Sequence, residues 1–193
     1  DKRVFEMYLN TMKLTEDDLR GKKILDIGSY SDAQFVNYCL EHKITNDIFA
    51  VDRNSFISQD NHNDEVQWRD KVAYEAYKKR KVTSPAKQRY ARGLAEELPF
   101  KEKSFDLIIV RAALTNPDQN LDAAISQIVS LLKSGGEARI GPFLPYHFSV
   151  QVRQIIGVLE NMTEFIEFKW EDTFRTEDHP DVVRKILVIK KKM

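Results

Sequence analysis

One stretch near the start of the chain restricts its fold more than any other: Lys23-Ile24-Leu25-Asp26-Ile27-Gly28-Ser29-Tyr30-Ser31-Asp32. Its apolar run is typical of a strand that is buried on both faces. Gly28 then marks a tight turn, because glycine adopts backbone conformations that other residues avoid. We expect Ser31 or Asp32 to cap the helix that follows, over about 32–43. A strand, a glycine turn and a helix in this order predict an α/β fold.

A second strand is predicted over 47–51, and it ends at Asp52. The strand–helix–strand order implies a right-handed crossover and two parallel strands. The carboxyl ends of parallel strands lie at one edge, so Asp52 is expected beside the Gly28 turn. A doubly wound α/β domain holds a nucleoside with this combination, because the turn lets the ligand approach and the carboxylate accepts both ribose hydroxyls.

The rest of the chain continues the alternation of strands and helices. Short apolar runs predict strands over 90–94, 105–110, 137–140, 166–170 and 182–189, and helical spacing predicts helices over 121–132 and 148–162. Gly135-Gly136 resembles a helix C-cap, 173–180 reads as a polar loop, and the three lysines at 190–192 read as a frayed tail. These elements predict one domain over 1–193 with a mostly parallel, seven-stranded sheet whose last strand is antiparallel.

Composition excludes several classes of protein. Lys+Arg and Asp+Glu both number 30, which removes any global electrostatic argument for nucleic acid or an anionic membrane. The single cysteine, Cys39, excludes an internal disulfide and a cysteine-based zinc site, and no metal site is expected. No run is long enough to span a bilayer, and no signal-like N-terminus is present. A cytoplasmic protein is therefore the expectation.

Two segments stand outside the regular alternation. Residues 1–20 form an amphipathic helical leader, which either packs on the sheet or acts as a lid over the ligand. Residues 53–92 form a long insertion, with nine Lys/Arg against two acids between Arg69 and Arg92. A solvated basic helix is the favoured interpretation of this insertion, and contact with nucleic acid is the less favoured alternative.

The order of motifs resembles the class I S-adenosylmethionine-dependent methyltransferases, especially their type 11 branch. Ile24–Gly28 is similar to the first motif of that family, and Asp52 matches its acidic strand end. Residues 95–107 resemble its A-E-x-L-P-F…S-F-D-L signature. Arg111–Leu114 and Leu131–Gly136 resemble the next two landmarks. Five landmarks in the right order imply the Rossmann-like methyltransferase fold and S-adenosylmethionine as cofactor.

The resemblance also implies site residues. Asp26 orients the amino group of the cofactor, Asp52 holds its ribose, and the others line it; the full cofactor-binding set is Asp26, Gly28, Ser29, Asp52, Arg53, Ala95 and Glu96. Arg111, Tyr146 and His147 are the catalytic candidates near the substrate edge. His147 is a candidate general base because the unperturbed pKa of histidine is about 6.5. The alternative is a surface or helix-capping histidine.

Departures from the family pattern keep a second function open. Tyr30 and Asp32 stand where the family has glycines, and Leu94 stands where it often has an aspartate that bonds adenine. These residues favour the alternative of a catalytically inactive scaffold that binds a partner. A nicotinamide oxidoreductase is less favoured, because Asp32 places a negative charge where a dinucleotide needs its pyrophosphate. The acceptor is expected to be a small molecule, and the sequence predicts neither its identity nor the oligomeric state.

Overall fold

The structure is a computed structural model of the chain, and it describes residues 2–29, 33–53, 85–111, 113–114, 120–143, 151–176 and 179–193. The helices are α1 (Lys2–Met12), α2 (Gln34–Glu41), α4 (Leu121–Leu131), α5 (Gln151–Glu160) and the short 3-10 helix η1 (Pro85–Arg89). The strands are β1 (Ile24–Ile27), β2 (Ile48–Asp52), β3 (Tyr90–Arg92), β4 (Phe105–Arg111), β5 (Leu132–Phe143), β6 (Ile166–Thr176) and β7 (His179–Lys191).

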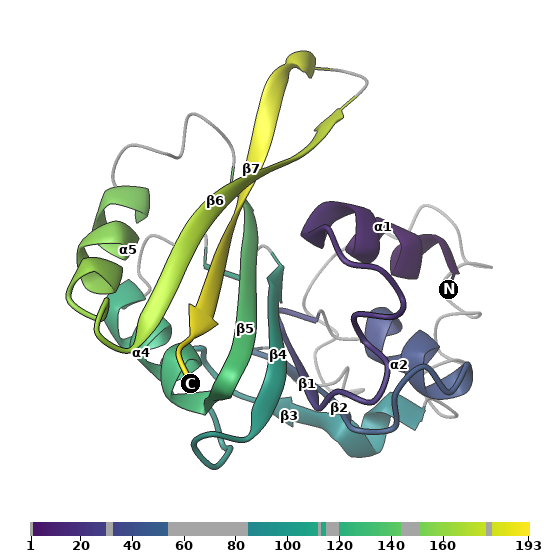
Figure 1. The fold of residues 1–193 in the computed structure, drawn as a ribbon. Coiled ribbons are helices and arrows are strands. Elements are labelled where there is room, and N and C mark those ends of the chain that lie inside the picture. The colour runs from purple at the N-terminus through teal and green to yellow at the C-terminus, as the bar shows by residue number, and fades with distance from the viewer. Residues whose placement is uncertain are drawn as a thin grey trace, which may run out of the picture.

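The strands form one sheet in the order β3-β2-β1-β4-β5-β7-β6 (Figure 1). The first five strands in this order are parallel, whereas β7 is antiparallel to both of its neighbours. This arrangement confirms the predicted doubly wound sheet. The order of the strands reverses its direction between β1 and β4. Open sheets of this type bind ligands at the carboxyl ends of the strands near such a point.

Helices cover both faces of the sheet, with α1 and α2 on one side and α4 and α5 on the other (Figure 1). Successive side chains of a strand point to opposite faces, so each central strand supplies both layers of the core. One face carries Ile24, Ile48, Leu107 and Ile109 and is called the α1 face below. The opposite face carries Leu25, Ile27, Ile108 and Val110. All eight side chains are buried, as expected for strands covered on both sides.

The end of α4 differs from the sequence-based expectation. The helix ends at Leu131, and β5 begins directly at Leu132, so the expected cap at Gly135-Gly136 is wrong. Gly135 does have a left-handed backbone (φ +74°), but it lies inside β5 where the register with β4 shifts. Lys191, far along the chain, instead donates its Nζ to the carbonyls of Val129 (3.0 Å) and Leu132 (2.9 Å).

The C-terminal hairpin is also more regular than predicted. The segment 173–180, expected to be a loop, belongs to β6 and β7 except for residues 177–178, which are outside the described part. The lysine tail is not frayed: Lys190 and Lys191 are in β7, and Lys192 Nζ donates to Thr163 O (2.8 Å). The two consecutive strands pair with each other through this polar segment, and its composition does not reveal the pairing.

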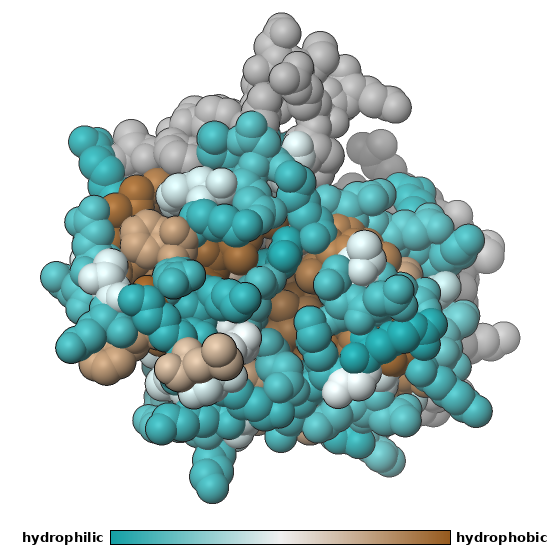
Figure 2. All heavy atoms as spheres, viewed as in Figure 1, coloured by the Kyte–Doolittle hydropathy of each residue, from teal (hydrophilic) through white to brown (hydrophobic). Residues whose placement is uncertain are grey.

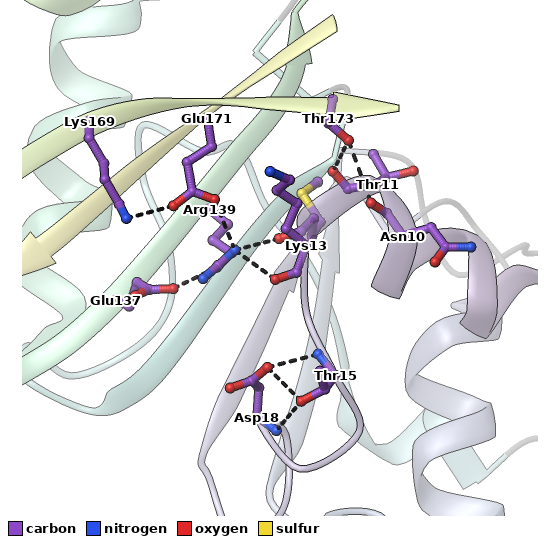
Figure 3. A network of polar contacts seen from close by, with 11 residues as sticks. Asn10, Thr11, Lys13, Thr15, Asp18, Glu137, Arg139, Lys169, Glu171 and Thr173 are labelled. Atoms are coloured by element: carbon purple, nitrogen blue, oxygen red, sulfur yellow. Dashed lines mark hydrogen bonds and ion pairs between the residues drawn. The ribbon is translucent and has the colours of Figure 1, made fainter. Parts of the chain in front are cut away.

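α1 is tied to the sheet at its C-terminal end (Figure 3). Arg139 of β5 donates Nη1 to the carbonyls of Met12 (2.7 Å) and Lys13 (2.9 Å), and Thr173 of β6 donates Oγ1 to Thr11 O (2.8 Å). Glu137 and Glu171 flank the same guanidinium, with N···O distances of 2.5 and 3.8 Å. The last carbonyls of a helix lack intrahelical partners, so these side chains complete the hydrogen bonding of α1. The N-terminal leader is thus a packed element of the fold.

The start of α2 and the basic insertion bear on two further expectations. The N-cap position of α2 is Ala33, which makes no side-chain cap bond, so the expectation that Ser31 or Asp32 occupies it is wrong. Most of the predicted basic insertion, 54–84, lies outside the described residues. No described helix is long and apolar enough to cross a membrane. On the face drawn in Figure 2, hydrophilic side chains cover most of the described surface.

Candidate functional site

Three ionisable side chains lie on the otherwise apolar α1 face, near the carboxyl ends of the central strands. Asp26 of β1 lies level with Ala50 of β2 and Ile109 of β4. Two residues further along, and therefore on the same face, β2 ends in Asp52 and β4 ends in Arg111. The fold thus brings together three of the residues that the sequence predicted for the site.

Asp26 is the most deeply placed of the three. Its side chain is completely buried, and Oδ2 accepts a hydrogen bond from the Tyr8 hydroxyl at 3.3 Å. Its other oxygen, Oδ1, has no hydrogen-bond partner among the described residues. Burial raises the pKa of Asp26 to about 8, Asp52 adds to the increase, and Tyr8 and Arg111 oppose it. The carboxyl group is therefore largely protonated at neutral pH.

Tyr8 reaches the site from α1 and was not identified as a functional residue in the sequence. Its ring stacks on Phe35 of α2 at 4.3 Å between centroids, and the Arg111 guanidinium lies 5.1 Å from its centre. Arg111 also contacts the Met7 sulfur through Nη2 at 3.3 Å. Burial, followed by the nearby Asp26, raises the pKa of Tyr8 well above its ordinary value. A sequence signal did exist, because a tyrosine in an apolar helical stripe needs a partner for its hydroxyl.

The chain turns at Gly28 after β1, as predicted. The need for glycine at this position follows from packing within the protein. Gly28 has φ +78°, and its N–H donates to Val51 O at 2.8 Å. A Cβ at this position would lie 2.5 Å from the Cβ of Ala113 and 3.0 Å from the carbonyl oxygen of Arg111. The glycine therefore lets the turn approach the end of β4. Ser29, next in the turn, is buried and also donates its N–H to Val51 O, at 3.3 Å.

The carboxyl end of β2 borders the end of β3. Asp52 is 8% exposed, and its backbone oxygen accepts from the Gly93 N–H at 3.0 Å. Arg53 follows at the surface, where its carbonyl accepts from Arg92 Nε at 3.1 Å. The Asp52 carboxylate consequently lies at the edge where the parallel strands end, with limited access to solvent.

The loop after β3 carries the remaining predicted cofactor residues. Ala95 is buried, whereas Leu94, at the position of the family's aspartate, is 55% exposed. Glu96 accepts from the backbone N–H of Asn120 through Oε1 at 3.2 Å and so joins this loop to the start of α4. Asn120 in turn caps α4, its side chain accepting from Ala123 N–H at 3.1 Å.

Several predicted residues cannot be placed relative to these groups. Tyr146 and His147, two of the three catalytic candidates, lie outside the described residues. The same holds for Tyr30 and Asp32, the two departures in the glycine motif. Arg111 is the catalytic candidate that the structure does place, and it lies at the predicted strand edge. Its guanidinium contacts α1, so in this structure it interacts with the leader.

Comparison with known proteins defines the class. A family model described as a methyltransferase domain matches residues 25–140, which is more than half of the chain. The chain therefore belongs to this methyltransferase family, as its motifs predicted. No curated protein matches it in sequence.

Solved structures extend the similarity over the whole fold. YcgJ from Bacillus subtilis superimposes with a TM-score of 0.56 at 14% identity, covering 100% of this chain and 99% of that one. A SAM-dependent methyltransferase from Methanosarcina mazei gives 0.51 at 15% identity, covering 89% and 92%. The [4+2]-cyclase SpnF gives 0.53 at 17% identity, covering 99% and 81%. At such identities the similarity establishes the fold alone.

Family membership implies S-adenosylmethionine as the cofactor, and the described residues fit it. Asp52 offers a carboxylate at a strand end, which suits two neighbouring hydroxyl groups. Asp26 offers a buried oxygen with no partner among the described residues, which suits a donor such as an ammonium group. The two carboxyls come from adjacent parallel strands. The donor set therefore matches a ligand that carries both a ribose and a cationic amino acid portion.

Proposed function

We propose that this protein is an S-adenosylmethionine-dependent methyltransferase that acts on a small-molecule acceptor. The observation that carries the proposal is the position of Asp52, which closes β2 beside the Gly28 turn. The residue lies at the strand edge and is 8% exposed. In this proposal it accepts the two ribose hydroxyls, and hydrogen bonds to a charged acceptor are stronger than those between neutral groups.

The other roles follow from position along the same edge. Gly28 and Ser29 line the cofactor beside the turn after β1, and Asp26 accepts from its amino group. Arg53, Ala95 and Glu96 lie toward the base. Arg111, together with Tyr146 and His147 beyond the described residues, is assigned to the acceptor side. The support for these roles is the strand-end position of the described residues and the order of the family motifs.

When bound, the cofactor supplies an activated methyl group. The chain's contribution is to hold donor and acceptor in line and to exclude water, which contributes several kcal/mol without a covalent nucleophile (about 7–11 kcal/mol for well-oriented groups). A buried face that carries only a few polar groups is suited to this task. In this proposal His147 takes up the proton that the acceptor releases.

A second candidate is a binding scaffold without methyl transfer. The exposed Leu94 favours it, because a leucine cannot accept a hydrogen bond from an adenine amino group. The chain is also similar in fold to a protein named a [4+2]-cyclase, so the fold alone does not specify methyl transfer. The two candidates differ in whether S-adenosylmethionine binds at the Asp52 edge.

Calorimetric titration with S-adenosylhomocysteine tests the proposal. Asp47 immediately precedes the opposite, amino-terminal end of β2 and is exposed, so Asp47→Ala is a matched control for Asp52→Ala. We expect micromolar binding by the wild type and by Asp47→Ala, and a loss of about tenfold or more, or ~1.4 kcal/mol, in Asp52→Ala. No heat and no thermal shift at millimolar ligand would overturn the methyltransferase proposal. Equal binding by all three proteins would overturn the role of Asp52.

A further inference from the structure

The carboxyl group of Asp26 is hydrogen-bonded on one side only. Oδ2 accepts from the Tyr8 hydroxyl at 3.3 Å, while Oδ1 has no partner among the described residues. The side chain is 0% exposed, so solvent does not substitute for the absent partner. A buried polar atom without a hydrogen bond costs free energy, and such atoms in native proteins call for a specific explanation. A ligand that donates a hydrogen bond to Oδ1 would be such an explanation.

Tyr8 is held rigidly enough to orient this carboxyl group. Its ring is fully packed between Phe35, at 4.3 Å between centroids, and the Arg111 guanidinium, at 5.1 Å from the ring centre. Further along α1, Arg139 and Thr173 bind the last carbonyls of the helix (Figure 3). The helix is therefore fixed both beside the site and at its C-terminal end. The position of the Tyr8 hydroxyl next to Asp26 Oδ2 is therefore well defined.

We propose that Tyr8 is a positioning residue of the cofactor site: its hydroxyl holds Oδ2 of Asp26, which leaves Oδ1 to receive a hydrogen-bond donor, such as an ammonium group, from the ligand. This inference rests on the proposed function, since it assigns α1 a part in binding the same cofactor. The first helix of the chain then belongs to the site, although no residue of α1 needs to touch the reacting atoms.

The groups around Asp26 determine how binding depends on pH. Facing it are Tyr8 from α1, Cys39 from α2, Asp52 from β2 and Arg111 from β4. Burial raises the pKa of the Cys39 thiol, so it remains neutral, and Arg111 is the cation of the group. The pKa of Asp26 is raised to about 8, and an ammonium donor favours its ionised form. Binding at neutral pH is therefore accompanied by proton release, and affinity rises with pH up to about 8.

The test compares Tyr8→Phe with Tyr38→Phe. The first change keeps the stacked ring and deletes the hydroxyl bound to Asp26. The second makes the same chemical change on α2, where Tyr38 stacks on Phe5 of α1 at 4.5 Å. Dissociation constants for S-adenosylhomocysteine are measured by calorimetry across pH, in two buffers of different ionisation enthalpy. A purely structural role for the hydroxyl alters thermal stability but leaves the pH profile of binding unchanged.

We expect Tyr8→Phe to bind about tenfold more weakly near neutral pH and Tyr38→Phe to match the wild type. Loss of the hydroxyl removes a bond that favours the carboxylate, so the break in the pH profile moves upward. In an Asp26→Asn background, which lacks the titrating carboxyl, the break should be absent both with and without Tyr8→Phe. If the wild type binds and Tyr8→Phe keeps its affinity and pH break, the inference is wrong and the proposed function stands. If the wild type does not bind, both are overturned.

Discussion

Among the residues of the site, Asp26 is a carboxyl group that is enclosed by apolar side chains. Asp26 lies on a face formed by isoleucine, leucine and alanine, and it is completely buried. The sequence predicted Asp26 as a site residue, because it belongs to the Ile24–Gly28 motif. What the sequence lacked was the partner, since Tyr8 is separated from it by 18 residues and a turn.

The stability of the protein should therefore fall as pH rises from about 4 to about 8. Asp26 titrates near 3.8 in the unfolded chain and near 8 when folded, so the folded state binds more protons within this range. The contribution is complete below the lower value and is lost as pH passes the upper one, with a slope of up to about 1.4 kcal/mol per pH unit. In Asp26→Asn this slope should disappear, whereas the exposed Asp47→Asn should retain it.

Urea unfolding at several pH values within this range measures the effect. The pKa values of Asp18, Asp106 and Glu171 are lowered, so their contributions to stability are lost only as pH falls below about 4.5, at the acid limit of this range. A free energy of unfolding that is flat or rises with pH in the wild type would show that Asp26 is ionised in the folded protein.

At the scale of the element, the position of α1 depends on side chains from two strands. The Arg139 side chain is 14% exposed, bonds two carbonyls at the end of the helix and pairs with two carboxylates (Figure 3). Its interactions are consequently shielded more than those of an ordinary surface ion pair. Lys169 contributes to the same network from a side chain that is 68% exposed, at 2.7 Å from Glu171.

Arg139→Met should destabilise the protein by about 2–3 kcal/mol, because it leaves helix carbonyls and a partly buried Glu137 without their donor. Lys169→Met removes an exposed partner from the same network and should cost no more than about 0.5 kcal/mol. Chemical denaturation compares the two variants, and hydrogen exchange of the α1 amides shows where the change occurs. Equal losses in the two variants, or exchange that increases throughout the sheet and not in α1, would contradict this anchoring role.

At the scale of the whole molecule, the sheet and its site edge could be predicted because their signals are local. Each of these signals lies within a short stretch of sequence: the apolar runs of β1, β2 and β4, the Gly28 turn and the charged strand ends. Parallel connectivity then brings Asp26, Asp52 and Arg111 to one edge without further information. The family match over 25–140 agrees with that reasoning.

The errors arise where strand pairing or a side-chain contact, and not local composition, decides the structure. Gly135-Gly136 follows an apolar helical stripe and so resembles a cap, yet Lys191 provides the donors at the end of α4. The loop predicted for 173–180 belongs mostly to a hairpin because β6 and β7 pair with each other. Tyr8 was not identified as a site residue, because it lies in the amphipathic leader and its partner lies in β1. Periodicity reveals which face of a helix is buried, but not which polar group lies opposite.

Ligand binding should stabilise the molecule as a whole, because the proposed site joins α1 to the strand ends of β1 and β2. A ligand that binds only the folded state at one hundred times its dissociation constant adds about 2.7 kcal/mol, which raises Tm by roughly 5–10 °C for a domain of this size. S-adenosylhomocysteine should produce this shift in the wild type and in Asp47→Ala, measured by differential scanning calorimetry. At the same ligand concentration Asp52→Ala should show a smaller shift, since its weaker binding lowers the ratio of ligand to dissociation constant. Exchange of the α1 amides should slow on binding in the wild type if the helix belongs to the site, and an unchanged rate with a full Tm shift would place the ligand elsewhere on the sheet.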